Sequence, residues 1–88
     1  MKVDMAKKFR DRGILGPGSR VYAQVQSRGF GGERIEIMKE LSVISLNEYG
    51  GIGHFVRDHR ENFTFNYDTI EEIDSMTPER LAKAYKIK

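Results

Sequence analysis

Three observations predict an α+β domain built on an antiparallel β-sheet. Residues 19–67 contain a succession of short segments in which apolar and polar side chains alternate, as in strands with one buried face. Glycine-rich connectors separate these segments, which favours hairpins between neighbouring strands. Helical patterns are confined to the two ends, at residues 1–13 and 77–86. With 88 residues, the chain is expected to form a single domain, 1–88, around one modest core.

The N-terminal segment predicts a short helix over Met5–Arg12. Asp4 precedes it as an N-cap, and Gly13 follows it where helices commonly end in a left-handed residue. Met5 and Phe9 lie one turn apart and form its apolar stripe. A terminal helix this short needs tertiary contacts, so it either docks through Phe9 or stays mobile until a partner binds.

The most regular stretch, residues 20–39, predicts a β-hairpin. Val21–Val25 and Arg34–Met38 alternate on either side of a glycine-rich loop. This loop carries Phe30 and, with Arg28 beside it, points toward solvent. The residues expected to face the core are Val21, Ala23 and Val25 in the first strand and Ile35 and Ile37 in the second.

Three further segments suit strands. Leu41–Leu46 has apolar residues on both faces, which is typical of a central strand, and Ile52–Val56 follows it after a tight turn. Gly50–Gly51 is expected to supply positive φ in that turn. The all-polar Arg57–Asn62 is expected to be an exposed loop. Phe63–Tyr67 then forms a last strand with its aromatic residues on one face.

Two local signals follow the last strand. Asp68 and Glu71 have the spacing of a capping box and predict a short helix. The residues between and after them, Thr69, Ile70 and Ile73, also suit a strand, so both interpretations stay open.

The C-terminal helix has the clearest start signal. Thr77 is suited to be its N-cap and Pro78 its first residue, because proline fits the first helical turn. Its expected buried stripe consists of Leu81, Ala84 and Tyr85.

These elements combine into a small curled antiparallel sheet of four or five strands with a short helix at each end. Two architectures are compatible with that strand count. One is a small barrel of the SH3-like kind, and the other is an open sheet backed by the helices.

Composition argues against several function classes. The chain has no cysteine, so neither disulfides nor thiolate metal sites are expected, which suits a reducing cytoplasm. His54 and His59 have only Asp58 and Glu61 nearby, too few ligands for a zinc site. No nucleophile motif is present, and we expect no cofactor and no enzymatic activity. No signal peptide or apolar span is visible, so no membrane partner is expected.

Charge is unevenly distributed along the chain. Residues 1–39 contain nine basic and four acidic side chains, residues 40–79 two and nine, and residues 80–88 four and none. If these segments separate in space, the molecule has a basic and an acidic face; otherwise adjacent elements neutralise one another.

Two kinds of binding surface follow from these patterns. A nucleic-acid interface would use basic and aromatic residues of the hairpin and the N-terminal helix, namely Arg20, Arg28, Phe30, Arg34, Lys7, Lys8, Arg10 and Arg12. A protein interface, to a partner or to a second copy, would use an exposed strand edge and residues of the later segments, namely Tyr49, Phe55, Asp68, Glu71 and Glu72. Protein binding is favoured because the net charge is only +2 and the middle of the chain is acidic.

One stretch of the hairpin resembles a known group of proteins. Residues 27–37 resemble the serine- and glycine-rich turn followed by Arg-x-Ile-x-Ile or Val in small uncharacterised accessory proteins of tailed bacteriophages. The resemblance implies a stoichiometric binder of a host protein or of nucleic acid. It implies no functional residues.

Overall fold

The computed structural model describes residues 1–28 and 31–87, with the backbone alone at 27 and 28. The molecule is elongated, with principal extents of 46 × 22 × 20 Å. Its elements follow in the order α1 (Val3–Asp11), β1 (Arg20–Arg28), β2 (Arg34–Leu46), β3 (Gly50–Phe55), β4 (Asp58–Asn66), the 3-10 helix η1 (Tyr67–Thr69), β5 (Glu72–Ile73) and α2 (Pro78–Ala84).

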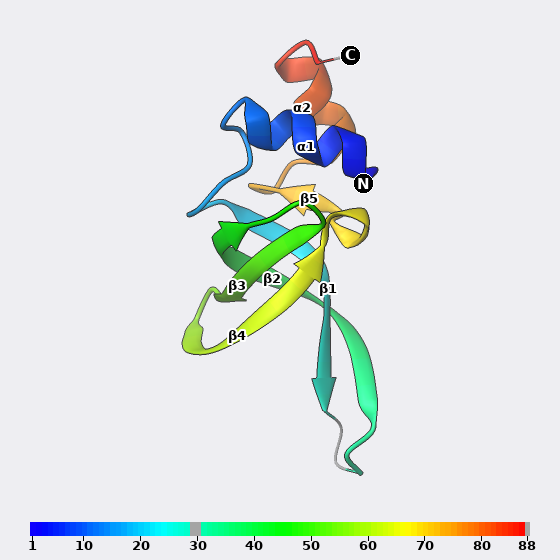
Figure 1. The fold of residues 1–88 in the computed structure, drawn as a ribbon, viewed down its shortest axis with the longest axis vertical. Helices are drawn as coiled ribbons and strands as arrows, with labels where there is room; N and C mark the ends of the chain where they lie inside the picture. Colours follow the sequence, from blue (N-terminus) through cyan, green and yellow to red (C-terminus); the bar gives the residue numbers. More distant parts are fainter. Residues whose placement is uncertain (29–30, 88) are drawn as a thin grey trace.

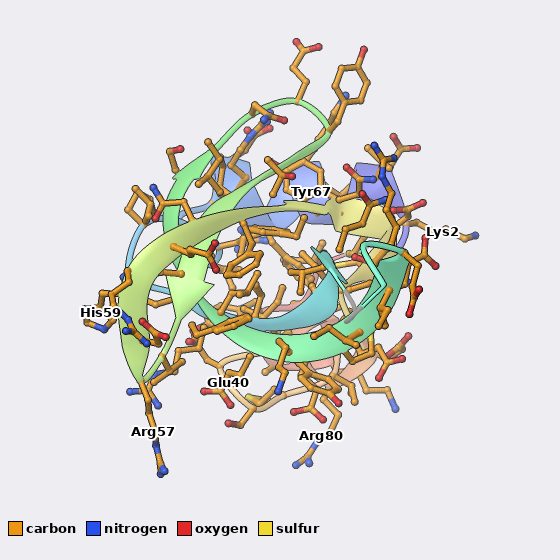
Figure 2. All side chains as sticks on the ribbon, turned by 90° about the horizontal axis from the view of Figure 1, so that it is seen from below. Lys2, Glu40, Arg57, His59, Tyr67 and Arg80 are labelled. Carbon is orange, nitrogen blue, oxygen red and sulfur yellow. The ribbon has the colours of Figure 1, made fainter. Side chains whose placement is uncertain are left out.

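The five strands form one antiparallel sheet in the order β4-β3-β2-β1-β5. The sheet curls around the core, as the view along the long axis shows (Figure 2), but it is not closed into a barrel. The expected α+β class is therefore confirmed, and of the two predicted architectures the open sheet is the one observed. β2 is its central strand.

Two parts of the molecule differ in their surroundings (Figure 1). The body consists of the two helices, β3 to β5 and the start of the β1–β2 hairpin. The arm is the part of that hairpin beyond Val25 and Ile37, and it extends away from the helices at the opposite end of the long axis.

The core lies between the concave face of the sheet and α1. Phe9 and Ala6 of α1 are fully buried, so the helix is docked. The Met1 ammonium group donates to the carbonyl oxygens of Asp68 and Ile70, each at 3.1 Å, and ties the same helix to the turn after β4. The other buried apolar residues come from β1, β2, β4, β5, η1, α2 and the connections after α1 and η1: Leu15, Val21, Ala23, Val25, Leu41, Val43, Phe65, Tyr67, Ile70, Ile73 and Leu81.

α1 ends as predicted but begins differently. Gly13, which follows the helix, has φ of 74°, in the left-handed region where helices commonly end. The N-cap, however, is Lys2 with no side-chain cap, because α1 begins at Val3. Asp4 therefore lies in the first turn, where its charge still suits the positive end of the helix dipole.

Several strand boundaries also correct the sequence interpretation. β2 is continuous from Arg34 to Leu46, because its first half pairs with β1 and its second half also pairs with β3. Residues 58–62, expected as a loop, belong to β4, and the hairpin turn is only Val56–Arg57. Polar composition is misleading there because this edge of the sheet faces solvent.

The glycines of β3 have a different role from the one expected. Among the described residues, positive-φ glycines are Gly13, Gly18 and Gly32, so Gly50 and Gly51 do not supply that conformation. A Cβ atom at Gly50 would lie 1.9 Å from the carbonyl oxygen of Phe65. Close approach between backbones, and not turn geometry, requires glycine at Gly50.

Of the two predictions for the C-terminal segment, one is wrong and one is confirmed. The short helix predicted from Asp68 and Glu71 is wrong: η1 spans Tyr67–Thr69, and the chain then pairs with β1 as β5. Thr77 caps α2 as predicted, its hydroxyl accepting from the backbone N–H of Arg80 at 3.4 Å.

The predicted buried stripe of α2 is only partly observed. Leu81 is buried, as expected, whereas Ala84 and Tyr85 are exposed. The other apolar residues of this segment that pack against the core are Ala82 and Ile87.

Candidate binding groove between the open edges of the sheet

The first open edge belongs to β1. β5 pairs with β1 only at Val21 and Tyr22, and no described strand continues along that side. The Tyr22 carbonyl oxygen accepts from the backbone of Glu71 at 2.8 Å on this outer side. Because alternate residues of a strand direct their backbone groups to the same side, those of Gln24 and Gln26 also point outward.

The second open edge belongs to β4, the other outermost strand of the sheet. The backbone N–H of Tyr67 donates to the carbonyl oxygen of Tyr49 at 2.9 Å. The backbone groups of the odd-numbered residues of β4 therefore point toward β3. The backbone groups of Asn62, Thr64 and Asn66 therefore point away from β3, toward the open side.

A single side chain joins the two edges at one end. The Thr69 hydroxyl donates to the carbonyl oxygen of Asn66 at 2.8 Å and accepts from the backbone N–H of Gln24 at 3.3 Å. Thr69 thus bridges β4 and β1 in place of a ladder of backbone hydrogen bonds. Beyond this bridge the edges leave a groove.

The groove has a volume of about 770 Å³. It is lined by residues of both edges and of the arm: Gln24, Val25, Gln26, Arg34, Glu36, Glu61, Asn62, Phe63, Thr64, Phe65, Asn66 and Thr69. Three of these are apolar, and the charged ones are mixed in sign, with Arg34 and Glu36 on the arm and Glu61 on β4. The Gln24 amide donates to the Glu36 carboxylate at 2.8 Å. The groove is therefore polar at its borders, and its charged side chains are one basic and two acidic.

The predicted basic residues do not form one surface. Arg34 is exposed on the arm, and the backbone of Arg28 lies directly opposite it in register. Lys7, Lys8, Arg10 and Arg12 lie on or just after α1, at the other end of the molecule. Arg20 lies between these groups and pairs with Glu40 at 3.6 Å. Phe30 lies outside the described residues.

Arg10 has a structural partner of its own. Its guanidinium group donates to the carbonyl oxygen of Asn47 at 3.0 Å and pairs with Asp11 at 3.5 Å. The Tyr67 hydroxyl donates to the same carbonyl oxygen. Hydrogen bonding with Tyr67 raises the pKa of Arg10. The hydrogen bond to Asn47 ties α1 to the β2–β3 turn.

The predicted protein-interface residues are also separated. Tyr49 is 73% exposed on the β2–β3 turn, beside a smaller hollow of about 330 Å³. Phe55 is half-buried and stacks on Phe63, with 4.4 Å between ring centroids. The acidic residues Asp68, Glu71 and Glu72 are exposed around η1 and the start of β5.

Sequence reasoning misses most of the groove. Glu61 and Asn62 lie in the segment that polar composition predicts as a loop, and Thr69 has no signal, because its role depends on two strands that are distant in sequence. The alternation of Thr64 and Asn66 with the aromatic residues of β4 is the one usable sign, since it places polar residues on one face of an outer strand.

The histidines lie together at the β3–β4 end of the molecule. The rings of His54 and His59 are 4.0 Å apart, and His59 is exposed. Their Nδ1 and Nε2 atoms lie 2.9 and 3.1 Å from the carbonyl oxygens of Phe55 and Val56. Across the described residues, no group of three or more His, Cys, Asp or Glu is placed to hold a metal ion.

Comparisons with known proteins give no relatives: no protein family, curated protein or solved structure matches this chain. Within residues 1–28 and 31–87, none of the helices has the length and apolar character needed to cross a membrane.

Proposed function

We propose that this protein is a non-enzymatic binding module that takes an extended segment of a partner protein into the groove between β1 and β4. One observation carries the proposal: two unpaired strand edges border the same groove. Backbone groups of Gln26 on one side and of Asn62 and Thr64 on the other are directed at it. An added strand pairs with such groups without needing a specific sequence.

The groove lining indicates what kind of segment fits. Val25, Phe63 and Phe65 offer apolar contact, and the surrounding amides and hydroxyls are polar. An extended segment with alternating side chains can meet both, because successive residues of a strand point to opposite sides. The resemblance of residues 27–37 to phage accessory proteins would make a host protein the natural partner.

Nucleic acid is less well supported as the partner. The candidate basic residues are divided between α1 and the arm, at opposite ends of a molecule 46 Å long. The groove itself carries Arg34 with Glu36 and Glu61, so it offers little net attraction for phosphates.

A peptide selection followed by a backbone test examines this proposal. Peptides selected from a random library on the immobilised protein would be titrated by calorimetry against Thr64→Pro and Thr64→Ala. Thr64→Pro removes one outward N–H that the β3–β4 ladder does not use, and Thr64→Ala is the matched control that retains it. We expect Thr64→Pro to weaken binding at least about tenfold and Thr64→Ala to leave it within about twofold.

The result that contradicts the proposal is equal peptide binding by the two variants, or no selectable peptide. Oligonucleotides titrated at two salt concentrations serve as the comparison ligand. Tight binding of these that weakens steeply with salt would favour the nucleic-acid alternative.

A further inference from the structure

A third open edge lies on the far side of the arm. β3 pairs with β2 only from Leu41 onward, so Arg34–Glu40 has β1 on one side and no described strand on the other. Figure 1 shows this β2 edge on the side of the arm away from β1. The backbone N–H of Val43 donates to the carbonyl oxygen of Ser19, and the carbonyl oxygen of Val43 accepts from the backbone N–H of Gly18. The backbone groups of odd-numbered residues of β2 therefore point toward β1. Outward backbone groups therefore belong to the even-numbered residues Arg34, Glu36, Met38 and Glu40.

This edge can pair with itself. In a two-fold dimer the same edge of each copy meets antiparallel, and outward-pointing residues must lie opposite one another. An axis through Ile37 satisfies this condition. It places Arg34 opposite Glu40 of the second copy, and Glu36 opposite Met38 of the second copy.

Charge disfavours three of the neighbouring registers. An axis through Glu36 would place Glu36 against itself, and an axis through Met38 would place Glu36 against Glu40. An axis through Lys39 would place two lysines face to face. Like charges directly opposite destabilise a strand pair, whereas Arg34 opposite Glu40 stabilises it twice, once at each end. A fourth register, with its axis through Ile35, would also place Arg34 opposite an acid, Glu36. It would, however, set Ile37 opposite Glu33 and leave Glu40 without a charged partner in the second copy.

The side chains on the concave side of the arm favour the same register. Ile35 is 40% exposed and Ile37 is half-buried, although both occupy the face that is buried in the body. The pairing brings the two Ile37 side chains together at the axis and sets Ile35 against the aliphatic part of Lys39. We propose that two copies of this chain dimerise through these β2 edges, with Ile37 on the axis.

The existing ion pair of Glu40 leaves it able to contact a second copy. Glu40 pairs with Arg20 at 3.6 Å, with about half of each side chain or more exposed, and Glu40 lies at the periphery in Figure 2. Such exposed pairs contribute little, so Glu40 can contact a second cation. A single pair of strands buries less than standard interfaces do, so we expect a dissociation constant on the order of 10–100 µM.

Charge reversal tests the register through sedimentation equilibrium over a range of concentrations. Arg34→Glu alone and Glu40→Arg alone each place like charges opposite one another at both ends, so each should weaken dimerisation at least about tenfold. An equal mixture of the two variants restores both attractive pairs and should form a heterodimer about as tight as the wild-type dimer. Wild-type protein that stays monomeric at millimolar concentration overturns the proposal, as does a mixture no tighter than its components.

Disulfide trapping gives an independent check, because the chain has no cysteine of its own. Ile37→Cys places two thiols directly opposite across the axis, within the distance a disulfide requires. Ile35→Cys is the matched control on the same face, displaced from its own counterpart by four residues of strand, or about 13 Å. Rapid cross-linking of Ile37→Cys with little of Ile35→Cys is expected. Equal cross-linking of the two would rule out this register.

Discussion

The body and the arm share two strands and one alternating pattern, yet their surroundings differ. Val21 and Val25 are buried in the body, while Ile35, on the same face of the sheet, is 40% exposed on the arm. α1, η1 and β4 cover the first region and not the second. Alternation therefore decides which way a side chain faces, and a covering element decides whether it is buried. We infer that the body provides most of the stability of the fold.

The largest expected difference between body and arm is in the loss of stability when an apolar side chain is truncated in each. Phe9→Ala removes a fully buried ring and should lower the free energy of unfolding by about 3 to 5 kcal/mol. Ile35→Ala removes a half-exposed side chain and should cost less than about 1 kcal/mol. Urea denaturation followed by circular dichroism measures both. Similar losses would show that the arm is part of the cooperative core.

A pair of glycine substitutions sharpens the same contrast with a smaller effect. Gly50→Ala places a methyl group against the β4 backbone and should cost about 2 kcal/mol or more, because neither strand can move freely. Gly32, next to the arm, has φ of 79°, and a Cβ atom added there would have no neighbouring atom within 4 Å. Gly32→Ala should therefore cost only about 1 kcal/mol, from the left-handed backbone alone.

Asparagine separates the two causes. It tolerates left-handed backbone, so Gly32→Asn should recover part of the loss, while Gly50→Asn should be at least as damaging as Gly50→Ala. Thermal unfolding measures all four variants. Recovery at both sites would mean that backbone conformation, and not close packing, restricts Gly50.

The smallest expected effect concerns the exposed β3–β4 end of the body. Hydrogen bonds from Arg60, at 3.0 Å to each carboxylate oxygen of Asp58, lower the pKa of Asp58 from 3.8 to about 2. Because the folded pKa is depressed, the stabilisation is present above pH 3.8 and is lost as pH falls through about 2. An NMR titration of the Asp58 carboxyl group should show its pKa return toward 3.8 in Arg60→Ala. An unchanged pKa in that variant would exclude Arg60 as the cause.

How much of the fold was predictable depends on the range of the interactions involved. The hairpin, the left-handed Gly13 and the Thr77 cap follow from neighbouring residues, and all were predicted correctly. The segment after Tyr67 was not, because Glu72 and Ile73 become a strand only by pairing with Val21 and Tyr22, some fifty positions earlier. The groove was missed for the same reason: Thr69 joins its edges only through two partners that are distant in the chain.

By itself, the sequence determined the alternation of inward and outward residues in the β1–β2 hairpin, the left-handed end of α1 and the cap of α2, and that the charge is nearly balanced, since these depend on periodicity, local backbone preferences and composition. Only the tertiary structure decided which apolar faces are covered, which strand edges stay open, and that the basic residues lie at opposite ends. These outcomes depend on how far the sheet curls and where the helices dock, which are settled by contacts between segments far apart in the chain.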